Sequence, residues 1–136
     1  MKGWLVSVRR AYDAAMLSSD PKAVEDRLRA LALTLPESDE KLSRGMPAFR
    51  VAGKMFAYFW HDHHADGMTR VGVKTTGRDE QDFLIEADPE TYSWLPYMGP
   101  SGWIGVSLAD GADWDVVEAR LASSWRLAAP GRLARA

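Results

Sequence analysis

With 136 residues, the chain has the length of one domain, and a globule of this size buries roughly two thirds of the surface that its unfolded form exposes. Hydrophobic residues make up 46% and charged residues 26%, and no run of about 18 uncharged apolar residues occurs, so the composition predicts a soluble protein without membrane-spanning helices. The formal net charge is -2 and there is no cysteine, which excludes disulfides, thiolate metal sites and cysteine nucleophiles and predicts a cytoplasmic protein.

The N-terminal residues predict a helical extension. Apolar residues recur there at helical spacing, among them Trp4, Val8 and Tyr12. The pattern ends in two serines before a new helix start. We therefore expect residues 1–20 to form an extension of the domain rather than part of it.

The next segment predicts a second helix, with which the domain proper begins. Asp20 is a favourable N-cap, and Pro21 suits the first helical position. One apolar stripe follows and ends at Pro36. The stripe consists of Val24, Leu28, Leu31 and Leu35. We expect a single domain over residues 21–136.

Three strands are expected in the middle of the chain, with polar loops before and between them. The expected strands are residues 48–51, 54–60 and 68–74, and the expected loops are residues 37–41 and 61–67. Ala52-Gly53 supplies a tight turn between the first two strands, since glycine takes a positive φ readily. Side chains alternate along a strand, so one face should carry Met55, Ala57 and Phe59, and the other Lys54, Phe56, Tyr58 and Trp60. In the third strand Arg70 and Lys74 should share a face.

The C-terminal half predicts a short helix, two further strands and a long final helix. These are expected at residues 77–87, 91–97, 103–108 and 113–129. Hairpin-linked strands bracketed by helices are typical of an α+β fold. We therefore expect a mainly antiparallel sheet of about five strands, with the helices mostly on one face.

A helix end and a hairpin carry a family resemblance. They are Leu35-Pro36 and, at residues 47–57, the run Pro-Ala-Phe-Arg-Val-Ala-Gly-Lys-Met-Phe-Ala. Together with the later Asp88-Pro89 and a helix ending in Ser-Trp-Arg-Leu, this pattern resembles the MmcQ/YjbR family of small bacterial proteins, roughly over residues 23–133. The resemblance implies an arrangement like that of frataxin or of secretion chaperones. It also implies DNA binding in a double-wing mode, through strands and hairpins.

Basic residues concentrate in the middle of the chain and support the DNA interpretation. Residues 41–78 hold seven basic side chains and two acidic ones, a local excess of five positive charges. The candidates for phosphate contact are Lys41, Arg44, Arg50, Lys54, Arg70, Lys74 and Arg78. Phe56, Tyr58 and Trp60 are candidates for stacking on bases, if that face of the sheet is open. The alternatives are solvated surface charge and an aromatic core.

The loop at residues 61–67 is the one weak candidate for a metal site. All three histidines of the chain lie there, and His61, His63 and Asp66 are the candidate ligands. No HExxH helix or distant histidine completes a site, and we expect neither a metal nor another cofactor.

The leading functional hypothesis is a non-enzymatic protein that binds DNA through its basic hairpins. The alternative is a protein-interaction or chaperone-like module, with a homodimer as one form of it. A metal-dependent enzyme using the loop from His61 to His64 ranks third.

Overall fold

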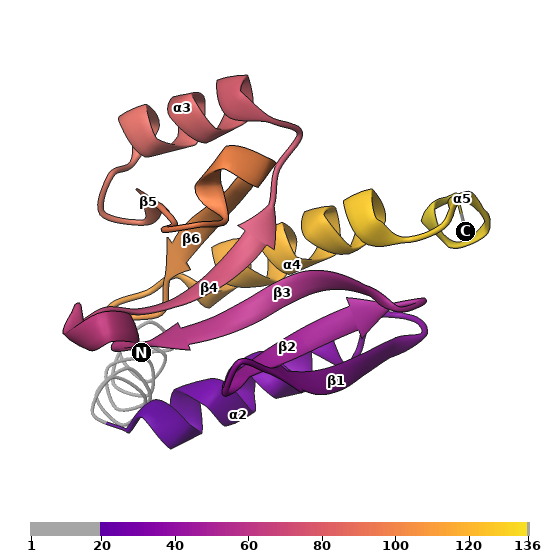
Figure 1. Cartoon of the computed structure of the whole chain (residues 1–136), viewed down its shortest axis with the longest axis horizontal. Helices are drawn as coiled ribbons and strands as arrows, with labels where there is room; N and C mark the ends of the chain where they lie inside the picture. Colours follow the sequence, from indigo (N-terminus) through magenta and orange to yellow (C-terminus); the bar gives the residue numbers. More distant parts are fainter. Residues whose placement is uncertain (1–19, 136) are drawn as a thin grey trace, which may run out of the picture.

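The computed structural model describes residues 20–135, so the predicted N-terminal helix lies outside the described residues. The helices are α2 (Pro21–Ala32), α3 (Arg78–Ala87), α4 (Trp114–Ala128) and α5 (Gly131–Ala134), and the strands are β1 (Ser38–Ser43), β2 (Met46–Val51), β3 (Lys54–His61), β4 (Thr69–Lys74), β5 (Tyr92–Trp94) and β6 (Trp103–Ser107) (Figure 1). Two short 3-10 turns complete the order, η1 (His63–Ala65) and η2 (Gly99–Ser101). None of the helices in residues 20–135 is both long and apolar enough to cross a membrane.

The strands form one antiparallel sheet in the order β1-β2-β3-β4-β6-β5. The predicted α+β fold with a mainly antiparallel sheet is confirmed. The predicted loop at residues 37–41 is wrong, because residues 38–43 form edge strand β1, paired with β2 along its whole length. Backbone pairing with an apolar neighbour outweighs the low strand propensity of Ser-Asp-Glu-Lys.

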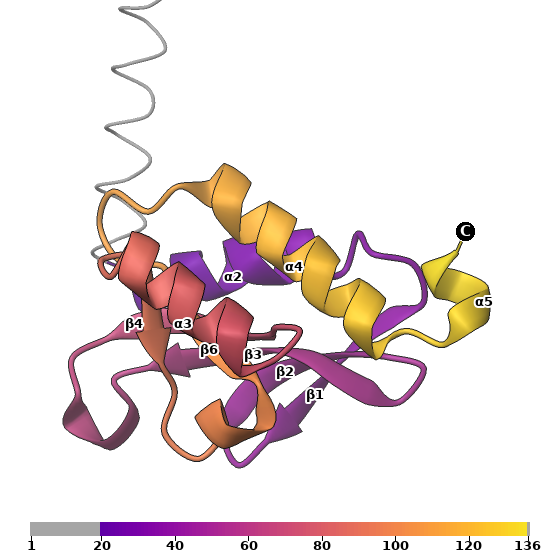
Figure 2. The same ribbon diagram turned by 90° about the horizontal axis from the view of Figure 1, so that it is seen from above.

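Helices α2 and α4 cover the same face of the sheet (Figure 2). Between the layers lies a core of fully buried side chains, including Leu28, Phe49, Val71, Ile104 and Leu121. Each such side chain contributes about 1.5–3 kcal/mol by burial, so this face fixes the registers of the strands. The side chains of Asp20 and Asp113 accept hydrogen bonds from the first turns of α2 and α4, as their positions predicted.

A β-bulge changes the predicted faces of β3. The register between β2 and β3 shifts between Phe49 and Arg50, so one extra residue fits into β3. As a result Phe56 joins Ala57 in the core under the helices, and Met55 packs on the opposite face. The predicted faces of Lys54, Met55 and Phe56 are therefore wrong, because strict alternation cannot anticipate a bulge; Lys54 is the register partner of the core residue Val51 and does not share the face of Tyr58 and Trp60.

Candidate nucleic-acid interface

The face of the sheet opposite α2 and α4 is called the open sheet face below. The registers align one row of residues across it from edge to edge: Lys41, Ala48, Tyr58, Gly72, Gly105 and Ser93. Glu40, the neighbour of Lys41, points to the helices, where it accepts a hydrogen bond from Arg29 of α2. Alternation therefore directs Lys41 to the open sheet face.

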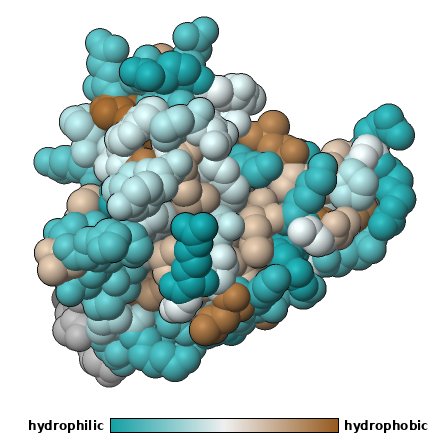
Figure 3. Space-filling view, in the orientation of Figure 1, coloured by the Kyte–Doolittle hydropathy of each residue, from teal (hydrophilic) through white to brown (hydrophobic). Residues whose placement is uncertain are grey.

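A second, smaller apolar cluster lies on the open sheet face. It has Trp60, Leu95 and Trp103 at its centre, with Met46, Met55, Tyr58 and Met98 packed around them. The rings of Tyr58 and Trp103 meet edge to face at 5.3 Å. The segment with Leu95 and η2 lies on this side of the sheet (Figure 2). Figure 3 looks onto the face and shows a pale to tan centre between hydrophilic side chains.

Four of the predicted basic residues form no ion pair with a described residue. Lys41 is exposed on the open sheet face, and Lys74 lies half-buried there, with Nζ 5.8 Å from the centre of the Trp103 ring. Arg44 and Lys54 are exposed at the β1–β2 and β2–β3 turns. These turns lie at opposite ends of β2 (Figure 1). The register partner of Lys54 is the core residue Val51, so Lys54 leaves β3 on the helix side, and the four cations do not form one cluster.

Three of the predicted basic residues form ion pairs with carboxylates: Arg50, Arg70 and Arg78. Arg50 makes two hydrogen bonds to Asp39, at 2.9 and 2.8 Å, and these lower the pKa of the Asp39 carboxyl. Arg78 donates to Asp82 at 2.8 Å. These pairs cancel part of the positive charge that the sequence concentrates in residues 41–78.

Arg70 is buried, with 4% of its surface exposed. One terminal nitrogen, Nη1, donates to Ser93 Oγ at 2.9 Å and to the Trp94 carbonyl at 3.3 Å, and Nη2 reaches Asp66 at 3.4 Å. Burial lowers the pKa of Arg70. Arg70 therefore ties β4 to β5 and does not present its charge at the surface.

The rings proposed for stacking are largely covered. Phe56 is 0% exposed in the core under the helices, and Trp60 is 2% exposed under the smaller cluster. Tyr58 alone of the three is half-buried. A base cannot stack on Phe56 or Trp60 in this conformation, so the stacking prediction is corrected for these two rings. Met46, Met55 and Trp103 also belong to this face, although they were not predicted there; for Trp103, the strand pattern at residues 103–107 was the available signal.

A protein-family model and a solved structure are similar to the chain. The YjbR family model matches residues 33–127. The chain belongs to the YjbR family. Among solved structures, the crystal structure of the Deinococcus radiodurans protein DR2400, a DUF419 domain, is similar with a TM-score of 0.62 and 22% identity over 75% of each chain. At this identity the similarity concerns the fold. No curated protein matches the chain.

In this YjbR protein the histidine-rich loop does not assemble a metal site. No group of three or more potential ligands within residues 20–135 is arranged to hold a metal ion. His63 packs its ring against Trp60 at 4.5 Å, and Asp66 is occupied by Arg70 and the Met68 amide.

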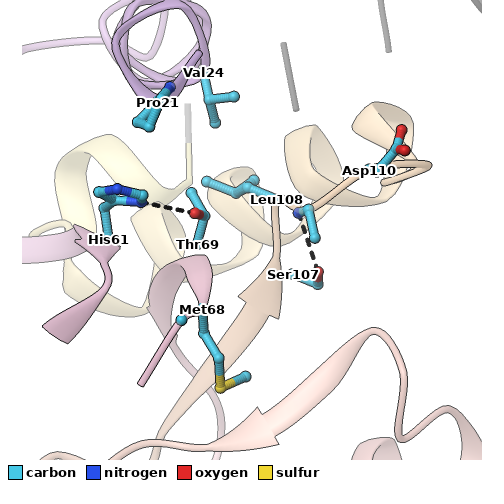
Figure 4. Close-up of a pocket in the computed structure, with 10 residues that line it drawn as sticks. Pro21, Val24, His61, Met68, Thr69, Ser107, Leu108 and Asp110 are labelled. Carbon is cyan, nitrogen blue, oxygen red and sulfur yellow. Dashed lines mark hydrogen bonds between the residues drawn. The ribbon is translucent and has the colours of Figure 1, made fainter. Parts of the chain in front are cut away.

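His61 instead lines a groove of about 430 Å³ at the ends of β4 and β6 (Figure 4). Its Nδ1 is hydrogen-bonded to Thr69 Oγ1 at 2.8 Å, and Val24, Met68 and Leu108 form the apolar wall. Among the described residues, the groove thus brings together the His61 imidazole, the Asp110 carboxylate and an apolar surface, and His61 is hydrogen-bonded to Thr69 and not to Asp110.

Proposed function

We propose that this YjbR protein binds DNA at the open sheet face through contacts to phosphates. The observation that carries the proposal is the shared orientation of Lys41 and Lys74, which lie on strands three positions apart on the face opposite α2 and α4. Strands are spaced about 4.8 Å apart, so the strands that carry the two lysines stand roughly 15 Å apart across the face. This separation lets a duplex backbone meet both.

Phosphate contact is favoured over stacking because the aromatic rings of the face are covered. Trp60 and Trp103 are 2% and 7% exposed, whereas Lys41, Arg44 and Lys54 are exposed. Contacts to phosphates carry no sequence information by themselves, so the binding should tolerate different DNA sequences. Arg44, exposed at the β1–β2 turn, extends the contact beyond the centre of the face.

Fluorescence anisotropy with a labelled DNA duplex at low salt tests the proposal. The double variant Lys41→Glu/Lys74→Glu should weaken binding at least about tenfold, because two phosphate contacts are replaced by repulsion. Arg126→Glu, an exposed change on α4 behind the sheet, is the matched control and should bind nearly as wild type does. Wild-type protein that fails to bind duplex at low salt, or a double variant that binds equally well, rules the proposal out.

A protein-interaction role is the second candidate, and strand β1 favours it. β1 is an edge strand, so one side of its backbone is unpaired within the described sheet. It also exposes Leu42, at 67%. Such an edge can add a strand from a partner or from a second copy. Light scattering after size exclusion should then show a dimer that Leu42→Lys dissociates, whereas a monomer at all concentrations excludes the homodimer.

A further inference from the structure

Two buried N–H donors on the open sheet face have no hydrogen-bond acceptor among the described residues. They are the indole Nε1 of Trp60 and the guanidinium Nε of Arg70. The residues are 2% and 4% exposed. A buried donor without an acceptor costs about 1–3 kcal/mol, and native proteins satisfy the large majority of such groups. Two at one place therefore call for a hydrogen-bond acceptor other than the described residues.

The two donors belong to neighbouring positions. Trp60 and Arg70 are register partners on β3 and β4, and the guanidinium carbon lies 5.9 Å from the centre of the indole. Beside them, Gly72 and Gly105 are register partners as well. A methyl group at Gly72 would come within 3.1 Å of Trp60 Nε1, and one at Gly105 within 3.0 Å of Arg70 Cδ. The missing side chains leave room next to both donors.

Leu95 fills that room. Its two methyl groups approach the same positions, Cδ1 at 2.9 Å from the Cβ position of Gly72 and Cδ2 at 3.2 Å from that of Gly105. Leu95 is fully buried. The Leu95 side chain cannot accept a hydrogen bond from either N–H donor. A polar group in its place would make hydrogen bonds that leucine cannot make.

The charge of the site is positive. Arg70 has one carboxylate near it, Asp66, at 3.4 Å and in a single contact, and its other acceptors, Ser93 Oγ and the Trp94 carbonyl, are neutral. A buried guanidinium with so little compensation favours an anion. The planar donor geometry of arginine suits phosphate and carboxylate oxygens.

The segments over the site are strained. Tyr97 has a φ of 66° in the segment that follows Leu95, and His64 and Ala65 have φ values of 54° and 60° in the loop that packs on Trp60. Each left-handed non-glycine residue costs roughly 1–2 kcal/mol. Such strain gathers at ligand clamps. His64 and Tyr97 also face each other at 6.4 Å, so the two segments meet over the donors.

We propose that Trp60 and Arg70 form a binding site for one phosphate group, which enters when residues 95–98 move and withdraw Leu95. Phosphate oxygens accept hydrogen bonds from Trp60 Nε1 and Arg70 Nε and compete with Asp66 for Nη2. The phosphate is free or belongs to a nucleotide. This small-ligand site is separate from the duplex contacts at Lys41 and Lys74, and the following measurements do not depend on DNA binding.

Two-dimensional NMR of the ¹⁵N-labelled protein observes both donors directly. Inorganic phosphate is titrated against chloride at equal ionic strength, and Trp60→Phe assigns the indole signal. The expected result is a saturable shift of the Trp60 Nε1–H and Arg70 Nε–H signals with phosphate alone. A parallel titration with a nucleoside monophosphate separates the two sources, since a nucleotide ligand should bind more tightly than free phosphate.

Two variants test the hydrogen bonds and the competition. Trp60→Phe should weaken phosphate binding about tenfold or more, as expected for one lost hydrogen bond to an anion. Asp66→Asn should strengthen it about two- to fivefold, because the competing carboxylate charge is removed. Asp82→Asn is the matched control, since Asp82 pairs with Arg78 at the same i,i+4 spacing but at the surface.

Either of two results would contradict the proposed phosphate site. One is that neither donor signal shifts with phosphate more than with chloride. The other is that the donor signals shift but binding is the same in wild type, Trp60→Phe and Asp66→Asn. If Trp60→Phe does not fold, through-bond and NOE assignment from the backbone signals identifies the Trp60 indole in the wild type, so the wild-type titration still decides the question.

Discussion

The small side chain of Ser124 links α4 to the backbone of two strands, β3 and β4. It is 0% exposed on α4, where its Oγ accepts a hydrogen bond from the Lys74 amide at 2.8 Å and donates to the Phe56 carbonyl at 2.6 Å. Phe56 is the extra residue of the bulge in β3 and has no register partner on β2. The hydroxyl therefore satisfies two backbone groups where the ladder between β3 and β4 has ended.

Ser124→Ala should lower the free energy of unfolding by about 2–4 kcal/mol, because it leaves a buried N–H and a buried C=O without partners. Urea denaturation monitored by tryptophan fluorescence measures the change. Ser123→Ala is the control, since Ser123 is the adjacent residue on α4 and is exposed; it should change stability by less than about 0.5 kcal/mol. Equal stability of the two variants would contradict this role of Ser124.

Helical spacing places Ser124 on the apolar face of α4, three residues after Leu121 and four before Ala128, and places Ser123 off that face. The spacing cannot show that the Ser124 hydroxyl bonds the backbone of Phe56 and Lys74, because this contact depends on the bulge, which is a property of two strands together and leaves no mark in the alternation of either one. The same limit explains Phe56, which the period of two assigned to the wrong face. By contrast, Asp20, Pro21 and Asp113 act through neighbours in the chain, and their positions were predicted correctly.

At the scale of elements, strand β1 is held by ion pairs as well as by its ladder. Glu40 accepts from Arg29 of α2 at 2.6 and 2.8 Å, and Asp39 on the other face accepts from Arg50 of β2. Hydrogen bonds from these arginines lower the pKa of both carboxyls. The acidic residues for which a loop was predicted therefore attach β1 to its neighbours: Glu40 to α2 and Asp39 to β2.

A carboxyl with a lowered pKa in the folded state contributes stability above its unfolded pKa and loses it as the pH falls through the folded value. The free energy of unfolding should therefore decrease as the pH falls from about 5 to about 3. Glu40→Gln should cost about 1 kcal/mol near neutral pH and should flatten this acid limb. Urea midpoints across the pH range measure both effects.

Glu118→Gln, at an exposed position on α4, is the control for this change and should keep the acid limb of the wild type. An equally steep acid limb in Glu40→Gln would show that the pair with Arg29 does not anchor β1. The sequence alone could not propose this pair, because Arg29 and Glu40 lie in different elements and their contact depends on the path of the chain after Pro36.

At the scale of the whole molecule, the chain is slightly acidic, with a formal net charge of -2, yet seven basic residues lie between residues 41 and 78. In the structure, some of these basic residues form ion pairs with carboxylates and the others do not. Arg50, Arg70 and Arg78 form ion pairs with Asp39, Asp66 and Asp82, whereas Lys41, Arg44, Lys54 and Lys74 have no carboxylate partner among the described residues. The sequence predicted the concentration of charge but not its partial neutralisation. All three acids lie within the basic segment or just beside it, and the pair of Arg50 with Asp39 depends on the pairing of β1 with β2, whereas Asp66 and Asp82 stand four residues from their arginines.

This division sets the expected salt dependence of DNA binding. Each phosphate neutralised on a duplex changes the slope of log Kobs against log salt by about -0.9. If Lys41, Arg44, Lys54 and Lys74 all make contact, the slope should be about -3.6, whereas engagement of all seven basic residues would give about -6.3. Lys41→Glu should make the slope less steep by about one, and Arg78→Gln should leave it unchanged, because Arg78 is already paired with Asp82. Anisotropy titrations over a salt series measure the three slopes. A slope near -6, or equal effects of the two variants, would mean that the ion pairs open on binding and that the free cations do not define the interface.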